Sequence, residues 1–164
     1  MNIKHSFMVM ALVSVAWGGA HAMQAAPPTT ACSLLAPAQV SAELGVPATG
    51  KSLGPKVCMW VQTGVTPGSP RRRVDVLLLL MPAFTGGYTA AQMPNAPTSA
   101  THVSGVGDDA YYLSMAHGRQ DMELRVKKGS VAFYIRVHLS GTPFTPDQIK
   151  AKEKALALDV LAKL

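Results

Sequence analysis

The stretch that decides the fold is MELRVKKGSVAFYIRVHL, residues 122–139. Apolar side chains occupy every second position from Met122 to Val126, and they do so again from Val131 to Leu139. Alternation with a period of two predicts β-strands that bury one face. The short Lys-Lys-Gly-Ser segment between the two runs predicts that they form a β-hairpin.

A two-residue turn at Lys128-Gly129 sets the register of this predicted hairpin. Apolar side chains then face one another in the core, and opposite charges meet on the outer face. The predicted pairs are Val126–Val131, Leu124–Phe133, Met122–Ile135, Asp121–Arg136 and Glu123–Tyr134. One register satisfies both faces of the hairpin, which supports the prediction.

Three further strands are predicted on the N-terminal side of the hairpin. They span Val57–Thr63, Val74–Met81 and Ala110–Met115. The run VLLLLM at 76–81 is apolar at consecutive positions, which is typical of a central strand covered on both faces. Residues 83–101 are interrupted by glycines and prolines, so they predict mostly loop with one or two helical turns.

Two helices flank the strands. Pro37 suits the first position of one helix and Gly45 the position just past its end. Thr145, Pro146 and Gln148 form a capping box at the start of the other. Residues predicted to face the core are Leu34, Val40, Leu44, Ile149, Leu156, Val160 and Leu164. The sequence therefore predicts an α+β fold, in which a single antiparallel sheet of about five strands carries N-terminal and C-terminal helices.

The N-terminal segment has the layout of a secretory signal peptide. Lys4 and His5 precede an apolar run from Phe7 to Trp17, and a small-x-small motif follows at 20–22. The run is shorter than the ~20 residues of a membrane span. The alternative is a buried N-terminal helix, but the segment is not amphipathic.

We therefore predict three parts. They are a signal peptide at 1–22, a flexible leader at 23–31 and a single α+β domain at 32–164, with Ala26 as a second cut site. Of the 15 Lys and Arg residues only Lys4 is lost with the signal, which leaves 14 against 9 acidic residues. The remaining chain is mildly basic and has no second apolar stretch long enough for a transmembrane span. It is expected in the periplasm or outside the cell, soluble after signal cleavage.

Cys32 and Cys58 are the two cysteines of the chain. An even count in an exported protein predicts a disulfide, which would stabilise the fold by roughly 3–4 kcal/mol on the chain-entropy model. The alternatives are free thiols or half of a metal site, and the histidines His102, His117 and His138 lack the spacing of metal ligands. A lipid anchor at Cys32 is not expected, because Cys32 lies fifteen positions after Trp17, the end of the apolar run.

Several short motifs resemble those of a family of small bacterial exported proteins of unknown function. They are Cys-Ser-Leu-Leu-x-Pro-Ala-Gln-Val at 32–40, Cys58 near Trp60, and Gly-Val-Gly-Asp-Asp-Ala-Tyr at 105–111. Many members of that family are lipoproteins, whereas this chain lacks a lipobox. The resemblance covers roughly residues 32–163, and it implies a fold and a compartment but no biochemical activity.

Asp108 and Asp109 are the most enzyme-like residues. Adjacent carboxylates after a glycine-rich turn are able to bind a cation or act as acid and base. The simpler interpretation is an Asx-type turn that starts a strand, because neighbouring strand residues point to opposite faces. Calcium-loop, phosphate-loop and nucleophile-elbow motifs are all missing, so neither a metal nor a cofactor is predicted.

Arg71, Arg72 and Arg73 are the candidate contacts for an anionic ligand or partner. Their simpler interpretation is a solvated loop at the start of a strand. Nucleic acid is not expected, since no aromatic residues are interleaved with the arginines. Arg125, Lys127, Arg136 and His138 share the outer face of the hairpin and offer at most a weak anion platform, because Asp121 and Glu123 partly neutralise it.

The leading functional prediction is a non-enzymatic binding or accessory protein of the cell envelope, whose partner is an envelope protein or an anionic small ligand. One alternative is an enzyme of unfamiliar type, which would need a cleft at 105–112. Another is an inhibitor or immunity-type protein that contacts a partner protein through residues 83–101 or through the arginines.

Overall fold

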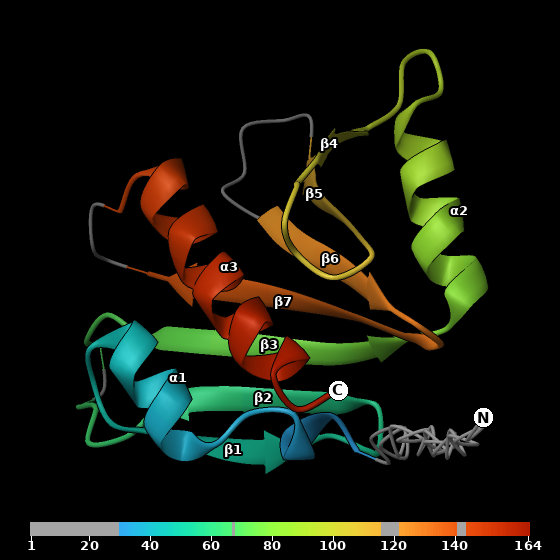
Figure 1. Ribbon diagram of the computed structural model, residues 1–164. Helices are drawn as coiled ribbons and strands as arrows, with labels where there is room; N and C mark the ends of the chain where they lie inside the picture. Colours follow the sequence, from blue (N-terminus) through green and yellow to red (C-terminus); the bar gives the residue numbers. More distant parts are fainter. Residues whose placement is uncertain (1–29, 67, 116–121, 141–143) are drawn as a thin grey trace, which may run out of the picture.

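The computed structural model describes residues 30–66, 68–115, 122–140 and 144–164 (Figure 1). The predicted signal peptide and nearly all of the predicted leader lie outside these residues. In chain order the elements are η1 (a 3-10 turn, Ala31–Ser33), α1 (Pro37–Leu44), β1 (Ala48–Ser52), β2 (Val57–Gln62), β3 (Arg72–Leu79), α2 (Met81–Ala91), β4 (Thr98–His102), β5 (Asp109–Met115), β6 (Met122–Lys128), β7 (Val131–Leu139) and α3 (Pro146–Leu161).

The strands form one antiparallel sheet in the order β1-β2-β3-β7-β6-β5-β4. The α+β class and the single antiparallel sheet are confirmed, but the sheet has seven strands and not about five. The two strands that we did not predict, β1 and β4, lie at its edges. Their sequences, ATGKS and TSATH, are small and polar, and their residues are mostly exposed. Short polar edge strands carry no apolar alternation, since they are paired on one side only.

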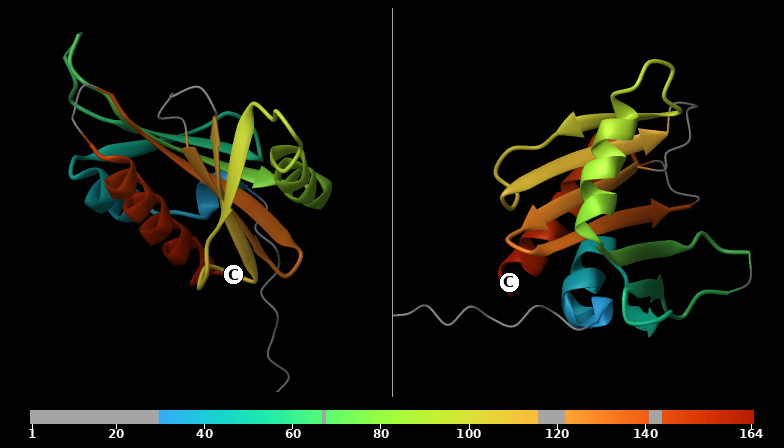
Figure 2. Two further views of the ribbon diagram at one scale, coloured as in Figure 1. Left: turned by 90° about the horizontal axis from the view of Figure 1, so that it is seen from above. Right: turned by 90° about the vertical axis from the view of Figure 1, so that its right-hand side faces the viewer.

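The helices divide between the two faces of the sheet (Figure 2). α1 and α3 pack together on one face and enclose the main core, in which Val74, Phe133 and Ile135 are fully buried. α2 packs on the other face, where Phe84 and Tyr111 form a smaller cluster. β3 and β7 lie at the centre and join the β1–β3 part of the chain to the β4–β7 part.

The hairpin of β6 and β7 is confirmed, but its turn is one residue further along than predicted. Lys128 pairs with Val131, so the turn consists of Gly129 and Ser130. Gly129 has φ +55°, a conformation that glycine adopts without strain at the first position of a tight hairpin turn.

This moves the register by two residues, which leaves every side chain on the predicted face. The observed pairs include Val126–Phe133, Leu124–Ile135 and Arg125–Tyr134. Glu123 consequently forms its ion pair with Arg136 and does not lie opposite Tyr134. Asp121, the predicted partner of Arg136, lies outside the described residues.

Residues 83–101 are not mostly loop, because α2 and β4 occupy most of them. Pro82 lies in the first turn of α2, where its missing N–H costs no hydrogen bond. Gly87 lies on the side of α2 that faces the sheet. A Cβ at this position would collide with the Arg125 guanidinium and the Tyr111 hydroxyl. Gly87, which predicted a break in the helix, therefore allows α2 to pack against the sheet.

Both terminal helices are confirmed. α1 ends at Gly45, which has φ +67°, and Thr145 caps α3 by accepting a hydrogen bond from the Gln148 N–H. The Cys32–Cys58 disulfide is also present, with 4.9 Å between the two Cα atoms. It ties η1 to β2 beside the main core.

α3 carries one buried ionisable residue that the predicted apolar pattern does not include. Glu153 is fully buried on the helix face that meets the sheet. Its Oε1 accepts a hydrogen bond from the Val137 N–H at 3.0 Å, while Oε2 has no partner among the described residues. Burial raises the pKa of Glu153 to about 8.

Candidate functional site

α2 leaves part of its own sheet face uncovered. Its main contacts are with β4, β5, β6 and β7, so no helix of the described chain lies over β2 and the adjoining part of β3 on this side. Strand alternation and register place Met59, Val61, Arg73, Asp75 and His138 on the uncovered part. Two apolar and three ionisable side chains therefore share a half-buried surface.

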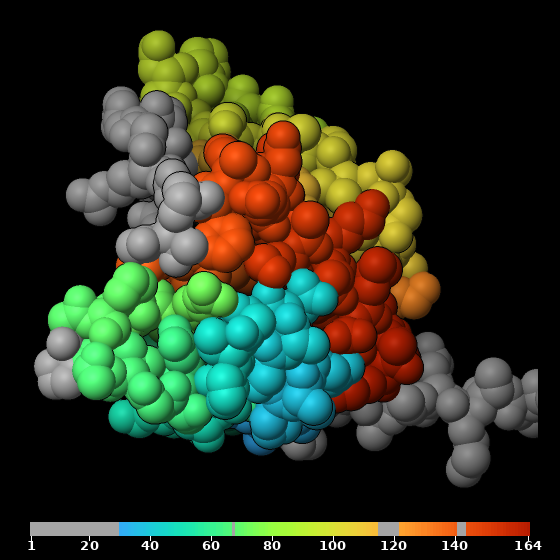
Figure 3. Space-filling view, turned by 90° about the vertical axis from the view of Figure 1, so that its left-hand side faces the viewer, coloured from blue at the N-terminus to red at the C-terminus, as the bar shows by residue number. Residues whose placement is uncertain are grey.

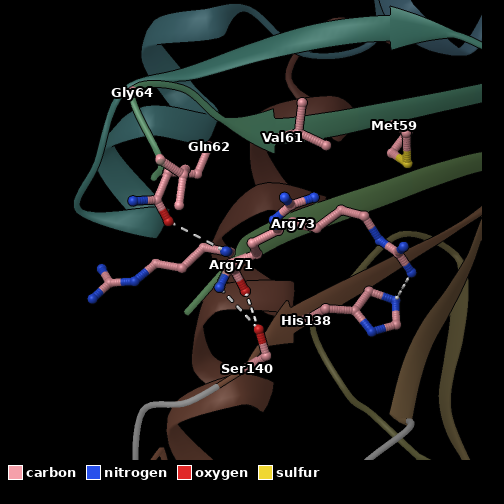
Figure 4. Close-up of a pocket in the computed structure, with 10 residues that line it drawn as sticks. Met59, Val61, Gln62, Gly64, Arg71, Arg73, His138 and Ser140 are labelled. Atoms are coloured by element: carbon pink, nitrogen blue, oxygen red, sulfur yellow. Dashed lines mark hydrogen bonds between the residues drawn. The ribbon is translucent and has the colours of Figure 1, made fainter. Parts of the chain in front are cut away.

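This surface contains a hollow of about 660 Å³, which we call the arginine hollow (Figure 4). Its lining includes Met59, Val61, Arg71, Arg73, His138 and Ser140. β2 supplies the apolar wall, while the start of β3 and the end of β7 supply the polar one. Figure 3 shows the end of the molecule beside it, where the β2–β3 segment (green) lies next to α1 (cyan).

The three consecutive arginines have three different roles. Arg71 is fixed through its backbone, whose N–H donates to Ser140 Oγ at 2.9 Å, and its side chain makes no hydrogen bond or ion pair within the described chain. Arg72 points to the opposite face, donates to the Leu44 carbonyl and lies 5.7 Å from the ring centroid of Phe144. The three arginines therefore do not form one cluster. Only the side chains of Arg71 and Arg73 remain available to a ligand on the uncovered face.

Arg73 belongs to a compact group with Asp75 and His138. Arg73 Nη2 lies 3.0 Å from Asp75 Oδ2 and 2.9 Å from His138 Nε2, and these last two atoms are 3.0 Å apart. Figure 4 shows Arg73 and His138 pointing toward each other, while Arg71 extends away from them. Asp75 thus orients two cationic or hydrogen-bonding groups at the edge of the hollow.

A second charged group lies beside it on the same face. Glu123 is only 3% exposed, and both of its carboxylate oxygens are bound by arginines. Arg125 contacts Oε1 at 2.6 Å, and Arg136 contacts Oε2. Burial alone would lower the pKa of Arg136, but the Glu123 carboxylate outweighs it and raises that pKa. Arg136 therefore remains a cation.

This group borders a smaller hollow of about 200 Å³, which we call the tyrosine hollow. Its lining includes Thr98, Glu123, Tyr134 and Arg136. Burial raises the pKa of Tyr134, so its hydroxyl stays protonated at neutral pH. Neither the Tyr134 hydroxyl nor the Thr98 hydroxyl makes a hydrogen bond within the described part of the chain.

Asp108 and Asp109 lie apart from both hollows and serve two different contacts. Asp108 accepts a hydrogen bond from the Gly129 N–H at 2.7 Å and pairs with Lys128 at 3.0 Å. The Gly129 hydrogen bond, followed by Lys128, lowers the pKa of Asp108. Asp109 lies 3.5 Å from His102, with both side chains about half exposed. Asp108 therefore stabilises the hairpin turn.

Sequence reasoning did not single out Asp75, Tyr134, Glu123 or Ser140 as site residues. Asp75 carried a usable signal, because it is the one charge inside the predicted apolar strand Val74–Met81. Glu123 and Arg136 were visible as charges on the outer face of the hairpin, but their pairing depends on the register. Ser140 meets Arg71 only through the pairing of β3 with β7.

The described residues contain no group of three or more His, Cys, Asp or Glu side chains able to hold a metal ion. Among the helices of the described chain, none combines the length and the apolar character needed to cross a bilayer.

Comparison with known proteins gives no match to a family model, to a curated protein or to a solved structure.

Proposed function

We propose that the protein is an exported, non-enzymatic binding protein of the cell envelope, and that the arginine hollow takes a small anionic ligand with an apolar part. The observation that carries this proposal is the composition of the hollow, which is lined by the apolar Met59 and Val61 together with Arg71 and Arg73. A volume of about 660 Å³ lies within the range of roughly 300–1,000 Å³ found for small-molecule sites.

The available hydrogen-bond donors favour an anion. The Arg71 guanidinium has no partner among the described residues, and Arg73 contacts Asp75 and His138 through a single nitrogen. A guanidinium presents several N–H donors in a planar fork that matches a carboxylate or phosphate. Asp75 holds Arg73 in place, so less conformational entropy is lost when a ligand binds.

Two of the described residues able to take part in catalysis are engaged in structural contacts, which favours binding over turnover. Asp108 is engaged by the hairpin turn, and Ser140 Oγ is engaged by the Arg71 backbone. Export is supported by the signal-like segment at 1–22 and by the Cys32–Cys58 disulfide, since disulfides persist in oxidising compartments. The motif resemblance to small exported proteins agrees with the same compartment.

The experiment is a titration of the oxidised protein with hexanoate and, separately, with 1-hexanol, followed by amide NMR shifts. Hexanoate is expected to perturb residues of the arginine hollow, and the alcohol of equal chain length to bind at least several-fold more weakly. Arg71→Gln should weaken hexanoate binding without affecting the fold, because its side chain has no partner among the described residues. Lys154→Gln on α3 makes the same charge change on the opposite side of the sheet and serves as control.

Equal binding of acid and alcohol, or equal effects of the two substitutions, would contradict the proposal.

A further inference from the structure

The two hollows lie next to each other along one strand. β7 supplies Tyr134 and Arg136 to the tyrosine hollow, and His138 of β7 and Ser140 just after it line the arginine hollow. Alternate residues of a strand share a face and are about 7 Å apart. Asp75 links the two, because it contacts His138 and pairs in register with Arg136. A ligand of moderate length held in the arginine hollow would therefore reach the tyrosine hollow.

The tyrosine hollow has a different chemistry from its neighbour. The arginine hollow combines an apolar wall with guanidinium groups, whereas this one presents the hydroxyls of Thr98 and Tyr134, which make no hydrogen bond within the described residues. Arg136 binds Glu123 through Nη2, and its Nε is buried, so Nη1 is the nitrogen that makes no hydrogen bond within the described chain and remains for a ligand. Hydroxyls both donate and accept hydrogen bonds, and guanidinium groups donate them.

Glu123 makes this arrangement rigid. A buried carboxylate requires charged partners, and here it is held by two arginines from its own strand and the neighbouring one. Arg125 is also committed to α2, since its Nη1 donates to the Ala83 carbonyl at 3.2 Å. Arg136 is consequently kept at the surface of the hollow in one orientation, ready to meet a polar ligand.

A volume of about 200 Å³ is below the usual size of a separate ligand site, so the tyrosine hollow is better suited to one part of a larger ligand. We infer that the ligand is a sugar acid. Its carboxylate binds Arg73 in the arginine hollow, where the exposed Arg71 adds positive charge, and its hydroxyl groups bind Tyr134, Thr98 and Arg136 in the tyrosine hollow. This inference rests on the proposed function and specifies its ligand class.

The test compares three probes by NMR titration of the oxidised, isotope-labelled protein. They are an aldobiouronic acid (one glucuronate joined to one neutral sugar), hexanoate and lactose. The aldobiouronic acid is expected to shift amides around both Arg73 and Tyr134, and to bind about tenfold more tightly than hexanoate. Two additional net hydrogen bonds account for that factor. Lactose, which lacks the acid group, should bind more weakly than either anion.

Two substitutions of the same kind separate the sites. Tyr134→Phe removes one hydroxyl from the tyrosine hollow and should weaken the aldobiouronic acid several-fold while leaving hexanoate unchanged. Tyr88→Phe makes the same change on α2, where the ring packs on Tyr111, and should affect neither probe.

If hexanoate binds as tightly as the aldobiouronic acid and Tyr134→Phe has no effect, the sugar-acid inference is wrong while the proposed function stands. If neither anion binds, the proposed function fails and the inference fails with it. Binding of lactose as tight as that of the acid would overturn the role given to the carboxylate.

Discussion

Replacing Glu153 by Gln should change how the stability of the protein depends on pH. Glu153 is fully buried between α3 and the sheet, and one of its oxygens accepts the Val137 N–H. Burial is the main cause that raises its pKa to about 8, and the charge of Glu123 adds to it. The hydrogen bond from Val137 and the charges of Arg136 and Lys150 act in the opposite direction without cancelling it. The folded protein therefore holds this carboxyl protonated at neutral pH.

The sign and size of the effect follow from the two pKa values. An exposed glutamate in the unfolded chain ionises near pH 4.5, whereas the folded one ionises near 8. Between these values the folded state binds the extra proton, so the free energy of unfolding falls as pH rises. The slope is at most ~1.4 kcal/mol per pH unit, which amounts to a loss of roughly 4–5 kcal/mol by pH 8. Below pH 4.5 the contribution is fully present, and above 8 the loss levels off.

Urea unfolding of the wild type and Glu153→Gln at pH 5, 6, 7 and 8 measures this difference directly. Glutamine keeps the acceptor for the Val137 N–H but does not ionise. The free energy of unfolding of the variant should therefore rise relative to that of the wild type at each step toward pH 8. Glu43→Gln makes the same substitution at a partly exposed position of α1 and should run parallel to the wild type. Curves for Glu153→Gln that also run parallel, within about 0.5 kcal/mol, would refute a buried protonated carboxyl.

Three further predictions concern the fold. Gly87→Ala should destabilise the protein by about 1–3 kcal/mol in urea unfolding, because its Cβ overlaps groups of the sheet, whereas Gly86→Ala, with open space around it, should be neutral or stabilising. Asp108→Asn should lower the melting temperature at pH 7, and the deficit should disappear as pH falls below 3.8, because the lowered pKa of Asp108 contributes stability only while the group is ionised; the same change at Asp109 should have a smaller effect. Reduction of the disulfide, which closes a loop between cysteines 26 positions apart, should cost about 3.5 kcal/mol of unfolding free energy; no loss on reduction would contradict the loop-closure argument.

The predictable part of the fold was the part with strong periodicity or explicit capping. β6 and β7 alternate along their whole length, and α3 begins with a capping box, so both elements were found. β1 and β4 carry neither signal, since an edge strand needs no apolar face. α2 was mostly missed because a glycine within a helix indicates a break, whereas Gly87 is tolerated here by its contact with the sheet.

The candidate site was predictable only as a set of charges. The arginines at 71–73 were identified, but alternation along β3 sends Arg72 to the opposite face from its neighbour Arg73. The contacts of Asp75 with His138 and of Glu123 with Arg136 depend on strand order and register. A sequence shows which residues carry charge, but the neighbours of each charge come from pairing between distant segments.

The pairing of β3 with β7 also affects how the chain reaches its folded state. Ser140 bonds to Arg71 across 69 positions of sequence. By contrast, the strand pairs on either side of the β3–β7 pair are joined by short connections. Closing so long a loop costs conformational entropy, and this slows the step. The pairing of β3 with β7 should therefore form after the local hairpins. Until it does, β3 presents the open edge of an apolar strand, and such edges pair readily with other chains. Aggregation during refolding should therefore begin at Val74–Leu79. Substitutions that weaken the pairing of β3 with β7 should increase the amount of aggregate.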